Sequence, residues 1–240
     1  MKNKEDFTKY WEQRISKIGN NIRSVGHKSF TNNENNLIYK AKFNILDKLS
    51  NKIIFKGKKL LDAGSGIGIF SDYYSKKGAE VYSIDGSPTA IEFTKKKAKI
   101  KIAKVAKLDK IPFKNNFFDL VHCFDVLYHI VDDNSWELSL KEFNRVLKKN
   151  GYLIILDFWK EKDSRPREHV KIRSRRKYLS VLKKLNFELV SEHELYFVLQ
   201  RNYLLTKLSP KLCLKLEKAY NYKIFKRFYG AKIVVFRKLK

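Results

Sequence analysis

The chain is poor in cysteine, in acidic residues and in long hydrophobic runs. Its 240 residues include only two cysteines, Cys123 and Cys213, too few for a disulfide framework or for a zinc site built from thiolates. Nowhere do eighteen apolar residues follow one another, and charges stand near the start where a secretory signal needs an apolar segment. These absences predict a cytoplasmic protein of a reducing compartment that does not span a membrane.

The shortage of acidic residues leaves a large positive charge. Asp and Glu number 25 against 52 Lys and Arg, which gives a formal net charge of +27. This excess either reflects the composition of an AT-rich genome or serves an anionic partner, because an anionic substrate, a nucleic acid or an anionic membrane surface each gains from a positive field. The hydrophobic content of 43% is enough for a globular core, and the length suits one domain with an insertion.

Apolar patterns alternate between strand and helix periods along the chain. Two helices are expected before residue 58, and Thr31 and Glu34 have the spacing of a capping box at the start of the second. An Asn150–Gly151 turn is expected before the fifth strand. Such alternation predicts an α/β fold, Rossmann-like, with a seven-stranded, mostly parallel sheet and helices on both faces. The expected strands cover residues 58–61, 79–85, 100–108, 118–125, 152–157, 187–192 and 232–236.

A glycine-rich turn, DAGSGIG, joins the first strand to a helix. A dinucleotide fold would require G-x-G-x-x-G, but Ile69 occupies the position of the third glycine. The order found instead is D-x-G-x-G-x-G. A glycine-rich turn after a parallel strand lets a ligand approach the N-terminus of the following helix.

Two later segments extend this motif. They are KIPFKNNFFDLVHCFDVLYHI, residues 110–130, and RVLKKNGYLIILD, residues 145–157. With them, the sequence resembles the class I S-adenosylmethionine-dependent methyltransferases, and most closely the ubiquinone-biosynthesis type (type 11 methyltransferase domain). The resemblance runs from about residue 58 to residue 157 and implies S-adenosyl-L-methionine as the cofactor, S-adenosyl-L-homocysteine as the product, and no metal.

The resemblance also implies where the cofactor binds. Asp85, at the end of the second strand, is expected on the ribose hydroxyls, and Asp62 is expected to orient the loop and the amino end of the cofactor. Leu108 and Asp109 are expected beside the adenine, although Lys107 stands where relatives often have an acid. Asp125 is the candidate for the methionine portion. The candidate cofactor-binding set is Asp62, Gly64, Ser65, Gly66, Gly68, Asp85, Gly86, Leu108, Asp109, Phe124 and Asp125.

Proton removal from the acceptor requires a base, and His129 just beyond the fourth strand is the candidate catalytic residue. Its alternative is a structural histidine that caps the following loop. Cys123 is expected in the core, and Asp157 in the acceptor pocket. The basic loop after the fifth strand either binds a phosphate or carboxylate of the acceptor or forms a solvated face. Its arginines are Arg165, Arg167, Arg173, Arg175 and Arg176.

The predicted organisation is an N-terminal helical cap over the cofactor site, residues 1–52, followed by a methyltransferase domain, residues 53–240. A basic insertion at about residues 195–230 is expected to cover substrate or to rest on anionic lipid. The predicted reaction is methylation of oxygen or nitrogen on a small, anionic or lipid-like metabolite. An RNA methyltransferase is the alternative enzyme, less favoured because FDVL replaces an NPPY-like tetrapeptide, and a non-catalytic cofactor-binding scaffold is the other. The expected cap residues over the cofactor are Tyr10, Trp11, Arg14, Arg23 and His27.

Overall fold

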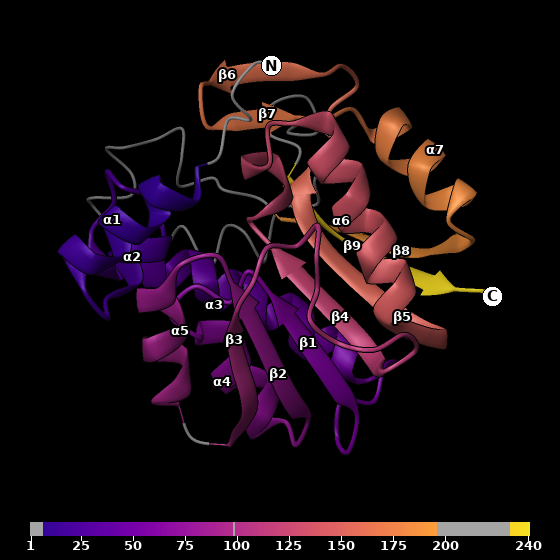
Figure 1. Ribbon diagram of the computed structural model, residues 1–240, viewed down its shortest axis with the longest axis horizontal. Coiled ribbons are helices and arrows are strands. Elements are labelled where there is room, and N and C mark those ends of the chain that lie inside the picture. Colours follow the sequence, from indigo (N-terminus) through magenta and orange to yellow (C-terminus); the bar gives the residue numbers. More distant parts are fainter. Residues whose placement is uncertain (1–6, 98, 196–230) are drawn as a thin grey trace.

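A computed structural model describes residues 7–97, 99–195 and 231–240 of the chain. These residues form a seven-stranded sheet in the order β3-β2-β1-β4-β5-β9-β8 and a separate two-stranded sheet, β6-β7 (Figure 1). The elements are α1 (Thr8–Ile18), α2 (Ile22–Val25), α3 (Asn32–Ser50), β1 (Lys59–Ala63), α4 (Ile69–Lys76), β2 (Glu80–Asp85), α5 (Pro88–Lys95), β3 (Ile100–Val105), β4 (Phe118–Phe124), the 3₁₀ turn η1 (Leu127–His129), α6 (Asp133–Val146), β5 (Leu147–Phe158), β6 (Ser164–Arg167), β7 (Val170–Ile172), α7 (Arg175–Lys184), β8 (Phe187–Glu194) and β9 (Ala231–Lys238).

The sheet is mostly parallel, as the alternating pattern predicts. Strands β1 to β5 pair in parallel, whereas β9 pairs antiparallel with both β5 and β8. The chain passes from β1 to β2 and β3 on one side, then returns to β4 on the other side of β1. This reversal places a topological switch point at the carboxyl ends of β1 and β4, which is where open α/β sheets bind ligands.

Alternating side chains along the strands build one core on each face of the sheet. Leu61 of β1 packs with Trp136 of α6 and Tyr178 of α7. Leu60, the preceding residue, points to the other face and packs with the side chains of α3 and α4, among them Leu46. The fold predicted from the sequence is therefore confirmed, with helices on both faces.

In the described residues, three helices precede β1 where the sequence analysis expected two. The additional helix is the single turn α2, which Asn21 caps by accepting a hydrogen bond from the backbone N–H of Arg23. The predicted capping box of α3 is present, because Thr31 and Glu34 bond reciprocally. Figure 1 shows α1 and α2 at the end of the sheet where the strands finish, close to the β6–β7 hairpin.

Several predicted boundaries shift. Pairing of β5 with β4 begins at Leu147, because the chain bulges at Asn150, which has a φ of 63°, and continues as strand where a turn was expected. β3 ends at Val105, three residues early, and its last hydrogen bond to β2 runs from the N–H of Ala106 to the carbonyl of Asp85. The loop expected after β5 contains the β6–β7 hairpin.

The predicted insertion at about residues 195–230 lies outside the described residues except for Leu195, which is buried against the α3 side of the sheet. In the described ranges, no helix is both long enough and apolar enough to pass through a bilayer.

Candidate functional site

A cavity of about 210 Å³ lies at the switch point. Its walls come from the turn after β1, the end of β2, the segment after β3, the end of β4 and the N-terminal helices. Segments far apart in the sequence therefore meet there because parallel strands end at one edge of the sheet. Of the predicted cofactor residues, the cavity is lined by Gly64, Ser65, Gly66, Asp85, Gly86, Leu108, Asp109, Phe124 and Asp125.

The glycine turn forms the floor of the cavity. Gly64 and Gly66 have φ angles of 83° and 53°, in the left-handed region that side chains rarely adopt. A Cβ at Gly64 would lie 2.3 Å from the side chain of Val126, which also lines the cavity. One at Gly66 would lie 2.8 Å from Val25 of the N-terminal helices. Both positions therefore require glycine, and both glycines line the cavity with backbone atoms alone.

Asp62 and Gly68 belong to the predicted set but lie outside the cavity lining. Asp62 is 1% exposed, and its carboxylate accepts hydrogen bonds from Ser71 of α4 at 2.5 Å and from the His122 ring at 2.9 Å. Ser71 also contacts Ser83 of β2 at 2.9 Å. Asp62 therefore ties β1 to the neighbouring β2, β4 and α4 beneath the glycine turn.

Asp85 faces the cavity while two backbone donors hold its carboxylate. Oδ2 accepts from the N–H of Gly66 and Oδ1 from the N–H of Ser87, each at 2.8 Å. Burial raises the pKa of Asp85 above its ordinary value, and the two backbone hydrogen bonds oppose this rise. Each oxygen keeps a further lone pair, so the carboxylate can still accept a pair of vicinal hydroxyls.

The segment after β3 supplies a mixed wall. Leu108 is buried, and Lys107, Leu108 and Asp109 all line the cavity. Ser135 and Ser139 of α6 line it as well, and they were not predicted. An apolar side chain beside small polar groups suits a flat heterocycle that carries hydrogen-bonding edges.

At the end of β4, Asp125 adopts a left-handed φ of 59° and forms an ion pair with Lys42 of α3. Lys42 is 4% exposed, and its ammonium also lies 4.6 Å from the centre of the Tyr39 ring. Tyr128 donates a weak hydrogen bond to the other carboxylate oxygen at 3.4 Å. Lys42 was missed because its partner is 83 residues away and α3 carries no motif.

His129 lines the cavity within η1. Its Nδ1 lies 2.8 Å from the carbonyl oxygen of His169, which can only accept, so Nδ1 carries the hydrogen and donates it. Nε2 is then the unprotonated nitrogen of the neutral ring. Burial lowers the pKa of His129 to about 4, so the ring is neutral near pH 7. Trp11 of α1 packs edge-on against the ring at 4.8 Å.

Helix α1 lines one side of the cavity with Thr8, Trp11 and Ile15, together with its N-cap residue Phe7. Among the predicted cap residues, Arg14 donates hydrogen bonds to the carbonyls of Arg23 and Gly26, and Tyr10 stacks on His169. These contacts tie α1 to α2 and to the β6–β7 hairpin.

Glu12 fastens α1 to the start of α5, beside Asp85. Its carboxylate accepts hydrogen bonds from the hydroxyls of Ser87 and Thr89, each at 2.5 Å, and from the backbone N–H of Thr89 at 3.2 Å. These bonds, with that of Ser87 the strongest, lower the pKa of Glu12 to about 2. This contact is not predictable from the sequence, because an isolated glutamate on an amphipathic helix carries no signal of its partner.

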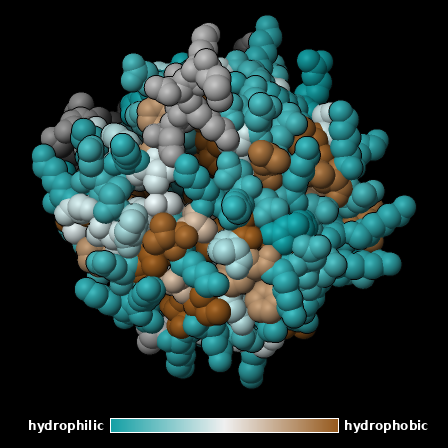
Figure 2. Space-filling view, in the orientation of Figure 1, coloured by the Kyte–Doolittle hydropathy of each residue, from teal (hydrophilic) through white to brown (hydrophobic). Residues whose placement is uncertain are grey.

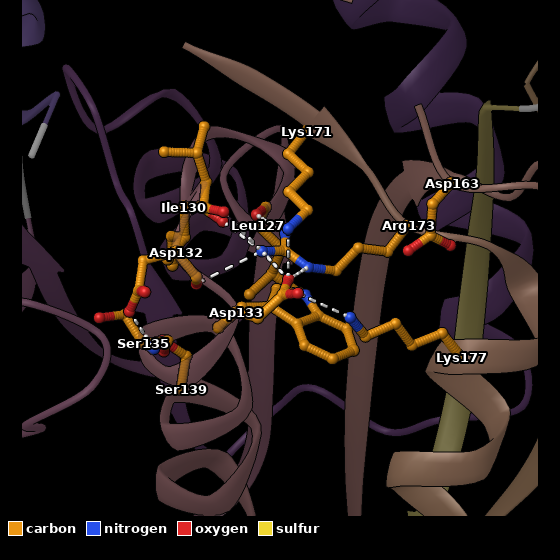
Figure 3. A network of polar contacts seen from close by, with 12 residues as sticks. Leu127, Ile130, Asp132, Asp133, Ser135, Ser139, Asp163, Lys171, Arg173 and Lys177 are labelled. Carbon is orange, nitrogen blue, oxygen red and sulfur yellow. Dashed lines mark hydrogen bonds and ion pairs between the residues drawn. The ribbon is translucent and has the colours of Figure 1, made fainter. Parts of the chain in front are cut away.

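Two arginines proposed for anion binding are instead held in the fold. Arg173 is buried and contacts Asp133 and the loop that precedes α6, which Figure 3 shows from close by. Arg175 pairs with Glu192 of β8 at 2.6 Å. Arg165, Arg167 and Arg176 are exposed. The expectation of an arginine cluster for the acceptor is therefore wrong for Arg173 and Arg175, because acidic or carbonyl partners from other elements already occupy them.

Asp157, expected in the acceptor pocket, is 1% exposed and lies outside the cavity lining. It accepts hydrogen bonds from the Tyr178 hydroxyl and from the N–H of Phe158. Cys123 is fully buried in the core, as predicted.

Comparison with known proteins supports the methyltransferase resemblance. Residues 61–155 match the family model described as a methyltransferase domain. A mitochondrial ubiquinone biosynthesis O-methyltransferase of Schizosaccharomyces pombe is 36% identical over 107 residues, which are 42% of this chain and 38% of that protein. The match thus spans well under half the length of this curated relative.

Solved structures share the fold at low identity. A crystal structure of the [4+2]-cyclase SpnF has a TM-score of 0.60 and 16% identity, and covers 82% of this chain and 81% of its own. An S-adenosylmethionine-dependent methyltransferase from Mesorhizobium loti has a TM-score of 0.59 and 16% identity, with coverage of 82% and 98%. The fold and the matched family imply S-adenosylmethionine as the cofactor. Residues 61–155 of this chain thus match a methyltransferase domain, within a fold that the chain shares with S-adenosylmethionine-dependent methyltransferases.

Proposed function

We propose that the protein transfers a methyl group from S-adenosylmethionine to an oxygen or nitrogen of a small acceptor. The observation that carries this proposal is the meeting of the open glycine turn, Asp85 and Asp125 around one cavity. S-adenosylmethionine supplies an activated methyl group on a sulfonium. The donor set suits it, because the cavity offers a carboxylate for a ribose, an apolar wall with polar edges for an adenine and the Asp125 carboxylate for an ammonium group.

We assign the cofactor contacts as follows. Asp85 accepts the ribose hydroxyls, and the bare backbone of Gly64 and Gly66 lets the cofactor lie close to β1. Leu108 and Asp109 contact the adenine. Asp125, which lines the cavity and is paired with Lys42, accepts hydrogen bonds from the ammonium group at the amino acid end of the cofactor. Asp62 supports this arrangement from below and makes no direct contact.

His129 takes the acceptor proton in this proposal. As the acceptor atom bonds to the methyl carbon, the bond from that carbon to sulfur breaks and its electron pair stays on sulfur. The acceptor proton moves to Nε2 of His129, while Nδ1–H stays bonded to the carbonyl of His169. Holding the two reactants in line is the larger contribution, worth roughly 7–11 kcal/mol.

We further propose that residues 1–52 act as a cap over the cofactor and that residues 53–240 form the catalytic domain. Trp11, Ile15 and Val25 line the cavity from the capping side, and Glu12 holds α1 on the catalytic domain. A chain that begins at residue 53 should therefore bind S-adenosylhomocysteine more weakly than the full chain.

The direct test is calorimetric titration of the full chain with S-adenosylmethionine, S-adenosylhomocysteine and NAD, repeated on Asp85→Ala. The expected result is binding of the two sulfur nucleotides, none of NAD and a clear loss in the variant. Failure to bind either sulfur nucleotide would overturn the proposal. Binding without methylation of any tested acceptor would favour the non-catalytic scaffold. The relation to a [4+2]-cyclase makes this control necessary, since the fold alone does not determine the chemistry.

The acceptor is proposed to be anionic or to lie at an anionic membrane surface, because one edge of the sheet is strongly basic. Nine of the twenty residues from 95 to 114 are lysine and one is acidic. Ile102 and Val105 of the edge strand β3 are 38% and 53% exposed between these lysines. Figure 2 shows hydrophobic residues among hydrophilic ones on this face. Lysines around exposed aliphatic side chains suit an anionic bilayer surface better than RNA, which also needs stacking aromatic groups.

Vesicle sedimentation tests this surface in the full chain. Binding to vesicles with phosphatidylglycerol, but not to pure phosphatidylcholine, should weaken in a Lys101→Glu and Lys104→Glu double variant. A Lys17→Glu and Lys48→Glu variant carries the same charge change elsewhere and serves as the control. Equal loss of vesicle binding in both variants would mean that net charge alone causes the binding. Tighter binding to RNA than to vesicles would favour the RNA methyltransferase. A cytoplasmic location belongs to the same proposal and is tested by cell fractionation.

A further inference from the structure

The loop from Leu127 to Asp132 forms the wall of the cavity that carries His129. His129, Ile130 and Asp132 line the cavity, and α6 begins at the next residue, Asp133. The carbonyls of Leu127 and Asp132 accept hydrogen bonds from the N–H groups of Ile130 and Trp136. The loop is irregular between these two bonds, so the carbonyls of Ile130 and Val131 need donors from elsewhere in the fold.

Arg173 supplies those donors, and Figure 3 shows its side chain extending toward Ile130 and Asp132. The residue is 1% exposed. Nη2 donates to the carbonyl of Ile130 at 2.8 Å and reaches those of Val131 and Asp132 at 3.3 Å, while Nη1 lies 3.5 Å from the carbonyl of Leu127. One planar guanidinium therefore lies within reach of four carbonyl groups of the loop.

Two further contacts fix the guanidinium itself. Nε donates to Oδ1 of Asp133 at 3.0 Å, and the guanidinium carbon lies 4.7 Å from the centre of the Trp136 ring. Asp133 also pairs with Lys171 at 2.9 Å and with Lys177 at 3.0 Å. Although burial opposes it, hydrogen bonds from these three cations lower the pKa of Asp133, so it remains a carboxylate.

The residues on either side of the hairpin strand β7 both contact the loop. His169, just before β7, accepts the hydrogen bond from Nδ1 of His129, and Arg173 directly follows the strand. Figure 3 shows Lys171 and Arg173 pointing toward the same loop. The loop is thus attached to β7 through the ring of His129 and through the carbonyl groups around it.

We propose that Arg173 is a positioning residue, which holds the loop 127–132 on β7. In this position His129 stays buried in the cavity wall, and its Nδ1–H donates a hydrogen bond to the carbonyl of His169. The effect on methyl transfer rests on the function proposed above, whereas the effect on the loop and on the His129 ring does not. Charge alone does not explain Arg173, because Lys171 and Lys177 already neutralise Asp133 and neither is bonded to the carbonyls that Arg173 collects.

The test compares Arg173→Lys and Arg173→Met with two matched controls, Lys171→Met and Lys177→Met. All four variants change a cation beside Asp133, but only the first two remove the guanidinium from the loop. Lysine keeps the charge without the planar fork, so it should not rescue the loop.

The readout is the His129 ring, followed by NMR titration of histidine-labelled full chain and assigned with His129→Gln. In the unmodified protein the ring should titrate near pH 4 with the hydrogen on Nδ1. Release of the loop in either Arg173 variant should bring water to the ring, raise its pKa toward 6.5 and mix the two tautomers. Both controls should keep the titration near 4. The groups that act on His129 besides burial are His169, Asp125 and Arg14, and all variants retain them.

A folded Arg173→Lys protein with an unchanged His129 titration and tautomer would overturn the proposal, and so would an equal shift in the lysine controls. Should Arg173→Met fail to fold, Arg173→Lys alone decides the question. With an acceptor in hand, kcat is expected to fall by about 100-fold in Arg173→Lys. If the unmodified protein binds no cofactor, the proposed function is wrong, but the His129 titration still tests whether Arg173 positions the loop.

Discussion

Lys42 and Asp125 form an ion pair that joins α3 to the end of β4 at the cavity. The lysine side chain is 5% exposed and the aspartate side chain is 30% exposed. Asp125 lines the cavity where the proposed function requires an amino acid group, and Lys42, which is outside the cavity lining, balances its charge. Their separation of 83 residues makes the pair a product of the fold.

Lys42→Met should destabilise the protein because it leaves Asp125 without its buried counterion. Removal of one partner of a buried pair costs roughly 3–5 kcal/mol, and the partial exposure of Asp125 puts the expected loss at or below the low end of this range. Urea unfolding measures it, with the exposed Lys48→Met of the same helix as the control. The double variant Lys42→Met and Asp125→Asn should recover part of the loss. A Lys42→Met protein as stable as its control would contradict the pairing.

The same variant should change which nucleotide binds better. Once Lys42 is removed, the uncompensated charge of Asp125 favours a cationic sulfonium over a neutral thioether. S-adenosylmethionine should then gain affinity relative to S-adenosylhomocysteine in calorimetric titration. If both ligands weaken equally, Lys42 instead contacts the carboxylate that the two have in common.

Asp85→Asn should weaken S-adenosylhomocysteine without removing the fold of the glycine turn. Hydrogen bonds to a charged group contribute about 1.5–3 kcal/mol, so the dissociation constant is expected to rise roughly 10- to 100-fold. Asp119→Asn removes a carboxylate that bonds Lys59 and Lys148 at the opposite end of β4 and serves as the control. If the two variants bind S-adenosylhomocysteine with equal affinity, Asp85 does not contact the ribose.

Glu12 should make the docking of α1 depend on pH. Its pKa is lowered to about 2 in the folded protein and returns to about 4.5 on unfolding. A depressed carboxyl pKa stabilises the folded state fully above pH 4.5, and this contribution is lost as the pH falls toward 2. The stability difference between the unmodified protein and Glu12→Gln should therefore be constant from pH 7 to 5 and shrink below pH 4.5.

Thermal unfolding across this pH range measures the effect of Glu12. The exposed Glu161→Gln should show no such narrowing, which makes it the matched control. A stability difference for Glu12→Gln that stays the same from pH 7 to pH 3 would mean that the carboxylate is not ionised in its contact with Ser87 and Thr89.

If His129 is the base, the rate should begin to fall only at an unusually low pH. Because burial lowers its pKa to about 4, the ring can still accept a proton at pH 5, where an ordinary histidine would be charged. The pH profile of kcat/KM is expected to stay level down to about pH 5. His129→Gln should lower kcat by about 10²–10⁴-fold, with His193→Gln as the control. An acid limb near pH 6.5 would exclude His129 as the base.

The sequence predicted the fold and much of the cavity wall because both depend on local patterns. The order of apolar runs predicts the parallel sheet, and the glycine turn and Asp85 follow from contacts between residues close in the chain, such as Gly66 and Asp85. Leu108 and Asp109 also line the cavity, as expected, because the segment after a parallel strand returns to the same edge.

The tertiary structure alone decided the parts that surround this wall. Lys42, Glu12 and Arg173 each contact partners between 40 and 83 residues away, and each stands in a segment that also reads as an ordinary charged surface. A charged side chain gives the same local sequence pattern whether it is exposed to solvent or buried against a loop. Only the packing of helices and the hairpin on the sheet determines which of these charges are buried and paired, and that information lies in contacts between distant segments.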